Sequence, residues 1–546
     1  MSDEHRRPAI VVAATPTSNG DLHLGHMAGP YLGGDVYARY LRATGRPVVY
    51  TTCTDDSQSY VTTTARRGGT TPELLCATST AAIRRSIEAM GISMAGLPPI
   101  DDRYRRTVLD FVGALHTAGR FRLRTVRLPF ASRSGACLYD AFVTGTCPVC
   151  LAGSCGGSCE TCGHPNNFDQ LLDPRSTTDP ADPVVYREHR VLVLPLEEYR
   201  DRLTAYYAAH DGRWRPRARQ LVGELLSRPL PEVPVTVPGT WGIAAPFPET
   251  PGQVLYPWIE AMPASMYSTW WTEARAGRVT ERVDEHWLAD NDAEIVYFHG
   301  FDNVYHWGLM DLVLLMAHGD RYALPTANVC NEFYDLEHEK FSTSRGHLIR
   351  GTELLAEVPR DLVRGYLALT APEYQRTNFS RAAMRQVVTR RLVDPWNGLA
   401  DALALCLMDA DTATPLPTSE RGRRDSAAVL ARFRLCYELP GFSMTRAAET
   451  VAGQVDRALA AAGTGTGTGL PGDVLLRARA VLAGAAPILT DVAAEAVAAG
   501  VDLGLSDASA RPAAVAAFRF PRLPGFEHRR TTPVAAQRDL PMEVKS

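Results

Sequence analysis

The stretch Ala9-Ile-Val-Val-Ala-Ala14, the turn Thr15-Pro-Thr-Ser-Asn-Gly20 and a helix-like segment from about Leu22 to Ala43 decide the fold. A second apolar strand, Pro47-Val-Val-Tyr-Thr51, follows and leads into Cys53-Thr-Asp-Asp56. Strand, helix and strand in this order predict a βαβ crossover, in which ligands bind beyond the carboxyl ends of the strands. We therefore expect a parallel sheet in which the turn and the end of the second strand meet at one edge.

A second strand, turn and helix occur much later, as Ala293-Glu-Ile-Val-Tyr-Phe298, Gly300-Phe-Asp302 and Val304 to Ala317. The region between carries a cysteine-rich insertion, and Arg187 to Leu226 is expected to be largely helical. From about Ser380 onward the sequence is Ala-rich with helical periodicity. The predicted fold class is α/β, a Rossmann-type catalytic domain split by a zinc-knuckle insertion and followed by an α-helical C-terminal domain.

The composition indicates a cytoplasmic protein with no membrane span. The chain has 546 residues, of which 45% are hydrophobic and 22% charged, as in packed globular proteins. Apolar runs such as Leu312 to Ala317 are far shorter than the roughly 18 to 20 residues of a membrane helix. The net charge of −4 mildly disfavours a nucleic-acid partner. Lys340 and Lys545 are the only lysines among 57 basic residues, so an internal lysine needs a specific reason.

Five of the eleven cysteines lie between Cys147 and Cys162. Cys147-Pro-Val-Cys150 and Cys159-Glu-Thr-Cys162 form two Cys-x-x-Cys pairs, a spacing typical of a structural Zn²⁺ held by four thiolates. A redox dithiol or a site that has lost its metal is the alternative. Cys155 lies between the pairs, which leaves the choice of the fourth ligand open.

The motif His23-Leu-Gly-His26 follows the first strand and begins a helix. Two imidazoles three residues apart share one helical face, and Gly25 lets a ligand approach the backbone. Such a site can bind a triphosphate, although two ordinary surface histidines would give the same pattern.

A second motif, Lys340-Phe-Ser-Thr-Ser344, lies about 300 residues downstream and makes the histidine motif more specific. Together the two motifs resemble the signatures of class I aminoacyl-tRNA synthetases, and more closely those of the methionyl-tRNA synthetase family. Further segments resemble that family in the same order: Pro16-Thr-Ser-Asn-Gly20, Asp55-Asp56, the cysteine pairs, Tyr256-Pro-Trp-Ile-Glu-Ala261 and Gly300-Phe-Asp302.

The resemblance implies a ligase in which an amino-acid carboxylate attacks the α-phosphate of MgATP, releasing pyrophosphate and leaving an aminoacyl-adenylate. The implied catalytic residues are His23, His26 and Lys340. The implied ATP-binding residues are Asn19, Gly25, Asp302 and Ser342 together with those three. The implied amino-acid-binding residues are Thr15, Thr17, Asp55, Trp258 and Trp307. For Asp55, a turn or cap carboxylate is the alternative. The expected cofactors are ATP, Mg²⁺ and a structural Zn²⁺.

The sequence departs from the family pattern in the loop and the pocket. Thr343 replaces the second signature lysine, so the loop keeps one cation of two. Thr17 and Ser265 stand where tyrosines are expected, and Trp307 where a histidine is expected. A pocket reshaped in this way predicts a small or polar amino acid rather than methionine. A shift of one residue would instead place His306 at the histidine position.

The C-terminal region lacks the features with which the family reads the anticodon. Trp396-Asn-Gly-Leu-Ala-Asp-Ala-Leu-Ala-Leu-Cys406 keeps an Asn but not the expected Arg, and Leu475-Leu-Arg-Ala-Arg-Ala480 has no Pro-Trp step. Stacking and Arg contacts hold single-stranded loops, so tRNA recognition is expected to be weakened. A divergent anticodon domain in another alignment is the alternative.

The predicted segments are two Rossmann halves (1–115 and 226–325), a connective insertion (116–225), a signature-loop and stem-contact-like region (326–385), a helical anticodon-binding-like domain (386–530) and a tail (531–546). The preferred hypothesis is a paralogue that passes the activated acyl group to a small-molecule acceptor. The synthetase-like half of hydrazine-forming enzymes is similar, and a cupin partner would be a separate chain because no cupin motif is present. The alternatives are a divergent methionine-tRNA ligase and a non-catalytic protein.

Overall fold

A four-stranded parallel sheet forms the centre of the N-terminal half of the protein. The computed structural model describes residues 7–341, 347–408, 410, 413–463, 470–506 and 511–526. The strand order is β14 (Ala327–Asn331), β13 (Glu294–Gly300), β1 (Ala9–Ala13) and β2 (Val48–Thr51). All three pairings are parallel, with Val11 opposite Val296 and Tyr50. The Rossmann-type sheet expected from the sequence is therefore present, and its two halves are brought together across the insertion.

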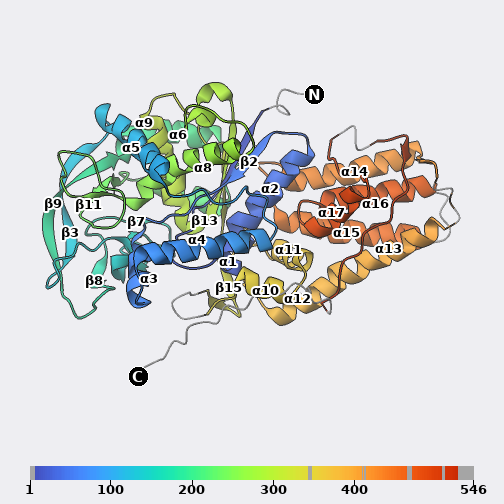
Figure 1. The fold of residues 1–546 in the computed structure, drawn as a ribbon, viewed down its shortest axis with the longest axis horizontal. Coiled ribbons are helices and arrows are strands. Elements are labelled where there is room, and N and C mark those ends of the chain that lie inside the picture. The colour runs from blue at the N-terminus through green and yellow to red at the C-terminus, as the bar shows by residue number, and fades with distance from the viewer. Residues whose placement is uncertain are drawn as a thin grey trace.

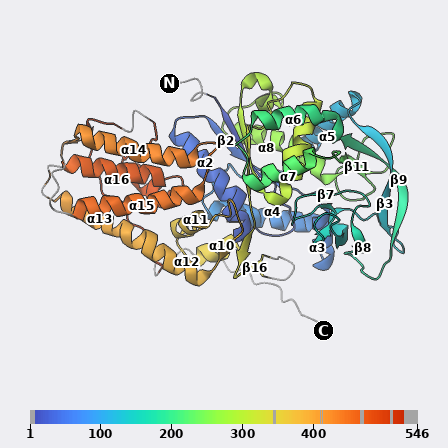
Figure 2. The same ribbon diagram turned by 180° about the vertical axis from the view of Figure 1, so that it is seen from behind.

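The inner strands are apolar because helices cover both faces of the sheet. Every residue of β1 is buried, and the same holds for Glu294 to His299 of β13. The helices of this half are α2 (Leu32–Ala43), α3 (Ser59–Arg67), α4 (Pro72–Ala89), α5 (Asp102–Thr117), α8 (Ala261–Arg275) and α9 (Asp311–Ala317), of which α2 packs on β1, β2 and β13, and α8 packs on β2. Figure 2 shows α8 lying over the sheet together with helices of the insertion.

Both long crossover helices begin with an irregular turn at the same edge of the sheet. After β1 the chain forms a short helix, α1 (Leu24–His26), and a π-helical turn, Met27–Tyr31, before α2. After β13 a 3₁₀ turn, Phe301–Asn303, and a π-helical turn, His306–Met310, precede α9. Such π turns are frequent at functional sites because they re-aim side chains.

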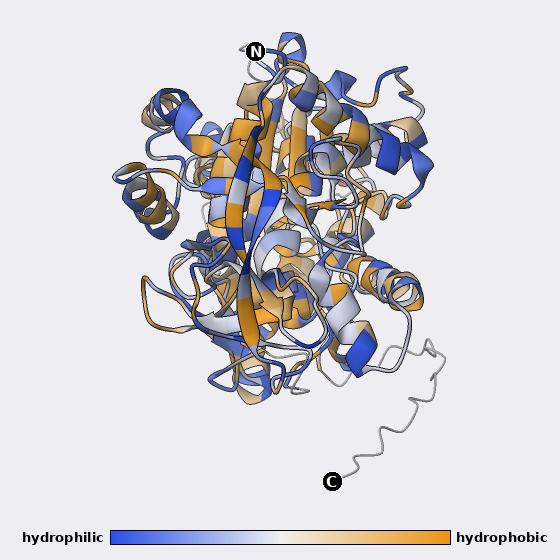
Figure 3. Ribbon diagram, turned by 90° about the vertical axis from the view of Figure 1, so that its left-hand side faces the viewer, coloured by the Kyte–Doolittle hydropathy of each residue, from blue (hydrophilic) through white to orange (hydrophobic). Residues whose placement is uncertain are grey.

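The insertion is built on a long antiparallel ribbon, β3 (Arg122–Ala131) with β9 (Val184–Pro195), extended by β10 (Glu232–Pro234). The expectation of a largely helical Arg187 to Leu226 is wrong for its first part. Val191 to Leu194 are buried β-formers paired to β3, a distant partner that local sequence does not reveal. Only α6 (Arg200–Ala209) and α7 (Pro216–Leu226) are helical there. Figure 3 shows the ribbon in front, carrying both hydrophilic and hydrophobic residues.

Short strands complete the insertion and the following region. They are β4 (Val143–Thr146), β5 (Gly153–Cys155), β6 (Gly157–Ser158), β7 (Pro165–Asn166), β8 (Leu172–Ser176), β11 (Thr236–Val237), β12 (Val254–Leu255), β15 (Tyr334–Leu336), β16 (Glu339–Lys340), β17 (Thr377–Phe379), β18 (Leu416–Pro417) and β19 (Ala514–Val515). The β4–β8 region carries the cysteine pairs, and β16 leads into the signature loop.

The C-terminal half is helical, as expected. Its helices are α10 (Gly351–Glu357), α11 (Arg360–Leu369), α12 (Arg381–Val388), α13 (Asp394–Cys406), α14 (Glu420–Tyr437), α15 (Met444–Gly463), α16 (Pro471–Ala485) and α17 (Thr490–Ala498). Figure 1 shows α13 to α17 as a bundle beside the sheet domain. The expected linker after Gly463 lies outside the described residues. No helix in the described parts of the chain has the length and apolarity to cross a membrane.

A fully buried ion pair joins the two halves. Arg364 of α11 contacts Asp35 of α2 at 2.7 Å, and both side chains are inaccessible to solvent. The same guanidinium donates to the carbonyls of Met90, Pro487 and Ile488. Because one side chain satisfies groups from the sheet domain and the bundle, it fixes their relative position.

Candidate active site

A cavity of about 400 Å³ lies at the carboxyl ends of β1 and β13. Nine of the residues singled out from the sequence line it: Thr15, Thr17, Asn19, His23, Gly25, His26, Asp55, Trp258 and Asp302. They come from segments up to 287 positions apart, from Thr15 to Asp302, so the fold brings the predicted constellation into one place. This location is the ligand position of an open parallel sheet.

The two signature histidines stack against each other at the start of α1. Their ring centroids are 3.8 Å apart, and the Nδ1 atoms of His23 and His26 accept from the backbone N–H groups of Gly25 and His23, respectively. With each Nδ1 an acceptor, each Nε2 carries the proton of the neutral ring. The surrounding protein atoms lower the pKa of His26, which keeps this ring neutral at pH 7. With both Nδ1 atoms occupied as acceptors, the two rings can donate hydrogen bonds to phosphate oxygens through Nε2–H.

Gly25 is required by the close packing of this turn. A Cβ at that position would lie 2.9 Å from Cε1 of His23 and 3.5 Å from the ring of Phe341. Any larger residue would push the His23 ring out of its stack.

The flanks of the signature loop are anchored to the histidine turn. Phe341 stacks on His23 at 4.7 Å with an interplanar angle of 10°. On the other side of the loop, the N–H of Leu24 donates to Ile349 O at 3.0 Å. Lys340, in β16, pairs through its backbone with Asp335 of β15. Ser342 and Thr343 lie outside the described residues. Of the two flanks, Phe341 lines the cavity and Ile349 is bonded to the histidine turn beside it.

The end of β2 supplies a carboxyl group to the cavity. Asp55 accepts from Nε2 of Gln58 at 2.8 Å, and its N–H donates to Pro16 O at 2.9 Å, which ties it to the first turn. Removal from solvent raises the pKa of Asp55 to about 8. Such a carboxyl gains stability from a cationic partner, as the ammonium group of an amino acid would provide.

Sequence reasoning missed Asp140, which also lines the cavity. Tyr256 donates to its Oδ1 at 2.7 Å, and burial raises the pKa of Asp140 to about 7. A Cβ at Gly157 would lie 2.7 Å from Oδ1, so the chain around β6 packs directly on this carboxyl. The only local signal was an acidic residue a few positions before the first Cys-x-x-Cys pair.

His306, and not Trp307, lies beside Trp258 in the structure. Trp307 is 1% exposed, does not line the cavity, and packs edge-on against Tyr297 with ring centroids 4.8 Å apart. His306 instead stacks on Trp258 at 3.7 Å and 4°. Both ring nitrogens of His306 are buried without a hydrogen-bond partner, and burial lowers its pKa to about 3. The expectation that Trp307 contacts the amino acid is thus wrong. His306 lies behind Trp258, as the alternative register implies, but it does not itself line the cavity.

The four knuckle cysteines are arranged as a metal site. Their sulfur atoms all lie within 4.8 Å of one another, with Sγ separations of 3.8 Å for Cys147 and Cys162 and 3.7 Å for Cys150 and Cys159. Four thiolates at about 2.3 Å from a tetrahedral Zn²⁺ are about 3.8 Å apart, so the set fits zinc. Cys155 is not a member of this group. Gly156 and Ser158, between the two pairs, and Glu160, within the second pair, line the cavity, so the knuckle forms part of its wall.

Comparisons with known proteins agree with this geometry. The family described as tRNA synthetases class I (M) matches residues 9–403. Methionine–tRNA ligase of Chlorobium limicola is 32% identical over 386 residues, which are 69% of this chain and 55% of that protein. The corresponding ligase of Christiangramia forsetii is 32% identical over 375 residues, which are 68% of this chain and 53% of that protein.

A solved structure shares the fold. Mycobacterium tuberculosis methionyl-tRNA synthetase bound by methionyl-adenylate superposes with a TM-score of 0.70 at 17% identity, covering 95% of this chain and 100% of that one. The chain spans about half the length of the curated relatives it matches. With the family match covering most of the chain and the signature segments gathered in one cavity, the protein belongs to the class I tRNA synthetases of the methionyl type.

Proposed function

We propose that the protein activates an amino acid with ATP, forming an aminoacyl-adenylate and releasing pyrophosphate. The observation that supports this most strongly is the convergence of the histidine pair, the Asp55 carboxyl and both flanks of the signature loop on one cavity. Adenylation needs positioned hydrogen-bond donors and cations rather than a protein nucleophile, and these groups are of that kind.

In the proposed reaction the carboxylate oxygen of the amino acid attacks the α-phosphate. The P–O bond to pyrophosphate breaks, and pyrophosphate leaves with the bonding electron pair. Asp55 binds the substrate ammonium and so directs the carboxylate toward the phosphate. The Nε2–H groups of His23 and His26 stabilise the negative charge that builds up on the phosphate oxygens. Lys340 and Ser342 contact ATP from the signature loop, Asn19 and Asp302 from the cavity rim, and Mg²⁺ accompanies ATP as its counterion.

Thr15, Thr17 and Trp258 surround the amino-acid side chain in this proposal. The Asp140 carboxyl accepts from Tyr256 and interacts with the indole N–H of Trp258, so Asp140 and Trp258 form a polar patch in the cavity wall. A polar substrate side chain can hydrogen-bond to such a patch, whereas a purely apolar one cannot. A small or polar substrate therefore suits this cavity better than methionine does.

We further propose that the acyl group passes to a small-molecule acceptor, such as an amine, hydroxylamine or alcohol. The nucleophilic atom of the acceptor attacks the acyl carbon and loses a proton, the bond from that carbon to the phosphate oxygen breaks, and AMP leaves. Asn397, the Asn that the helical domain retains, is already occupied: its Nδ2 donates to Leu523 O at 2.9 Å and its Oδ1 accepts from Leu523 N at 3.0 Å. The neighbouring Trp396 donates to Pro521 O at 2.8 Å. These bonds hold the Asn397 amide against the backbone of Leu523, which leaves it one N–H and one lone pair for any further contact. Any cupin partner in this scheme is a separate chain.

Transfer to tRNA is the second candidate function, and the sequence similarity to methionine–tRNA ligases favours it. The two functions separate in one experiment. Amino-acid-dependent exchange of pyrophosphate into ATP is measured with each of the twenty amino acids, and the active amino acid is then tested for attachment to total tRNA. Exchange with an amino acid other than methionine and no attachment to tRNA is the expected result. Exchange with methionine alone, followed by tRNA charging, would establish the second candidate.

A further inference from the structure

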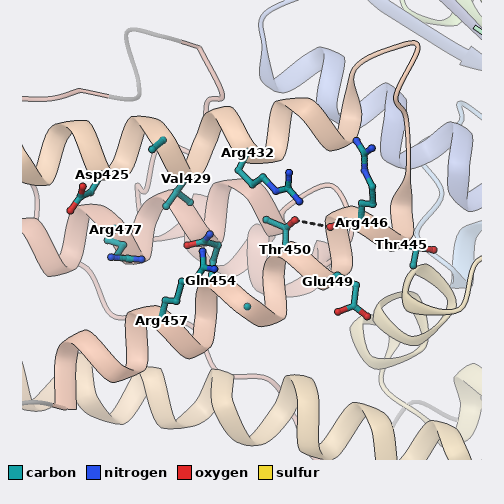
Figure 4. Close-up of a pocket in the computed structure, with 12 residues that line it drawn as sticks. Asp425, Val429, Arg432, Thr445, Arg446, Glu449, Thr450, Gln454, Arg457 and Arg477 are labelled. Atoms are coloured by element: carbon teal, nitrogen blue, oxygen red, sulfur yellow. Dashed lines mark hydrogen bonds between the residues drawn. The ribbon is translucent and has the colours of Figure 1, made fainter. Parts of the chain in front are cut away.

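The helical domain contains a second cavity, separate from the one at the sheet and lined by entirely different residues. It has a volume of about 600 Å³ and lies between α14 and α15, with one residue of α16 at its edge. Figure 4 shows its lining. Cavities of roughly 300 to 1,000 Å³ are the size of small-molecule and cofactor sites.

The lining of this second cavity carries an excess of positive charge. Four arginines, Arg432, Arg446, Arg457 and Arg477, face two acidic residues, Asp425 and Glu449. Glu449 is already neutralised from outside the cavity by Arg391, whose Nη1 lies 2.8 Å from Oε1. The cavity therefore presents more guanidinium groups than its own carboxylates can neutralise.

Three of these arginines are available for a ligand. Arg446 is engaged by carbonyl oxygens, including that of Gly441 at 3.1 Å. In the part of the chain that the structure describes, Arg432, Arg457 and Arg477 make no side-chain hydrogen bond or ion pair, and Nε of Arg477 is buried without a partner. Guanidinium groups of this kind bind phosphate through paired N–H donors.

A buried amide provides an independent sign of a ligand. Gln454 lines the cavity and is 6% exposed, yet its Oε1 has no hydrogen-bond partner. Figure 4 shows Gln454 close to Arg457 and Arg477 at one end of the cavity, whereas Arg432 and Arg446 lie toward the other end. An unpaired buried amide is costly, so a ligand with its own donor at this point would be stabilised.

The cavity walls also fit a flat, partly apolar group. Ala428 and Val429 supply apolar surface on α14. Across from them on α15, a Cβ at Gly453 would meet no atom within 4 Å, which leaves room beside Gln454. Arg457, Arg477 and Gln454 lie together at one end of the cavity, so a ligand with an anionic group beside a hydrogen-bonding, partly apolar group matches this end.

We propose that the α14–α15 cavity is a binding site for a nucleoside phosphate, with Arg457 and Arg477 on the phosphate and Gln454 on the base or sugar. The site is independent of the proposed adenylation reaction, because none of its residues lines the cavity at the sheet.

Calorimetric titration of the full-length protein with AMP, GMP, CMP, UMP and inorganic pyrophosphate tests this proposal. The double variant Arg457→Gln/Arg477→Gln removes the charges, and Gly453→Leu fills the space while keeping them. At least one nucleotide is expected to bind the wild type, and each variant is expected to weaken that binding about tenfold or more. Arg421→Gln, an exposed arginine on α14 outside the cavity, is the matched control and should change binding less than about twofold.

Each other outcome contradicts the proposal. Binding of no nucleotide, or binding that both variants leave unchanged, would remove the site and leave only binding at the sheet cavity. Pyrophosphate binding as tightly as any nucleotide would reduce it to a simple anion site. An RNA hairpin is titrated in parallel with the nucleotides. If the wild type binds the hairpin but no nucleotide, and the double variant loses affinity for the hairpin, the cavity is part of an RNA-binding surface instead. Thermal melting of each variant confirms that the helical domain remains folded.

Discussion

The cavity at the sheet and the cavity in the helical bundle differ in how they are built. In the first, residues from widely separated segments meet at the carboxyl ends of parallel strands, and the signature motifs of the family are retained there. In the second, neighbouring helices α14 to α16 supply arginines that match no family motif seen in the sequence. The proposed activation site and the proposed nucleotide site share no lining residue, so variants of one cavity can be tested without altering the other.

The largest change in the free energy of unfolding is expected at the buried ion pair that joins the two halves. Arg364→Ala would remove the fully buried partner of Asp35, leaving only the partly exposed Arg39 as its cation, and would leave the carbonyls of Met90, Pro487 and Ile488 without this donor. Loss of one partner of a buried ion pair typically destabilises a protein by about 3–5 kcal/mol. Chemical denaturation monitored by circular dichroism measures this change. Arg424→Ala, which removes an exposed pair with Glu420, is the control and should change stability by less than about 1 kcal/mol. Equal stability of Arg364→Ala and the wild type would show that the halves are held together by other contacts.

The next largest effect is expected on pyrophosphate exchange in variants of the sheet cavity. It tests whether that cavity alone performs amino-acid activation. His26→Ala should reduce amino-acid-dependent pyrophosphate exchange by about 10²–10³-fold, the usual loss for one transition-state donor. Lys340→Ala should abolish exchange, and Lys340→Arg should lose most of it because a planar guanidinium does not replace a compact ammonium.

Asn397→Ala, in the helical half, is the matched control for these variants. Its amide contacts only the backbone of Leu523, so exchange should stay within about twofold of the wild type. A large loss of exchange in Asn397→Ala, or full activity in Lys340→Ala, would contradict the assignment of activation to the sheet domain alone.

Zinc removal tests the wall of the sheet cavity. Cys150→Ser should eliminate bound zinc and lower the melting temperature, whereas Cys155→Ser should retain the metal, because the sulfur of Cys155 lies outside the four-thiolate group. Metal analysis by mass spectrometry and thermal melting measure both effects. Retention of zinc in Cys150→Ser together with its loss in Cys155→Ser would mean that Cys155 is the fourth ligand.

The smallest effect concerns pH. The pKa of Asp55 is raised to about 8 in the free protein, so its charge, and with it the attraction for an ammonium group, is present above that pH and lost as pH falls. The kcat/KM for exchange should therefore rise between about pH 6 and 8. Asp55→Asn should flatten this rise while lowering the activity. A wild-type profile with the opposite slope would contradict the role of Asp55.

Local motifs were predictable because their chemistry depends on short spacing. The His23 to His26 spacing, the two Cys-x-x-Cys pairs and the βαβ order each determine a local geometry that the structure contains. Asp140 was not predictable, since its position depends on the insertion folding back over β6.

The exchange of Trp307 for His306 has a specific cause. The chain enters α9 through a 3₁₀ turn and then a π turn, neither of which has the 3.6 residues per turn of an α-helix. Counting positions from Gly300 therefore does not determine which side chain faces Trp258. In the same way, β9 is a strand because β3 pairs with it across some sixty residues, which local propensity does not encode.

Direct detection of the aminoacyl-adenylate tests the central claim. The purified protein is incubated with ATP, Mg²⁺ and each amino acid in the absence of tRNA, and the products are separated and identified by mass spectrometry. The account predicts an aminoacyl-AMP and an equal amount of pyrophosphate with at least one amino acid, both formed about 10²–10³-fold more slowly by His26→Ala and not formed by Lys340→Ala. Absence of any adenylate in the wild type with all twenty amino acids would contradict it.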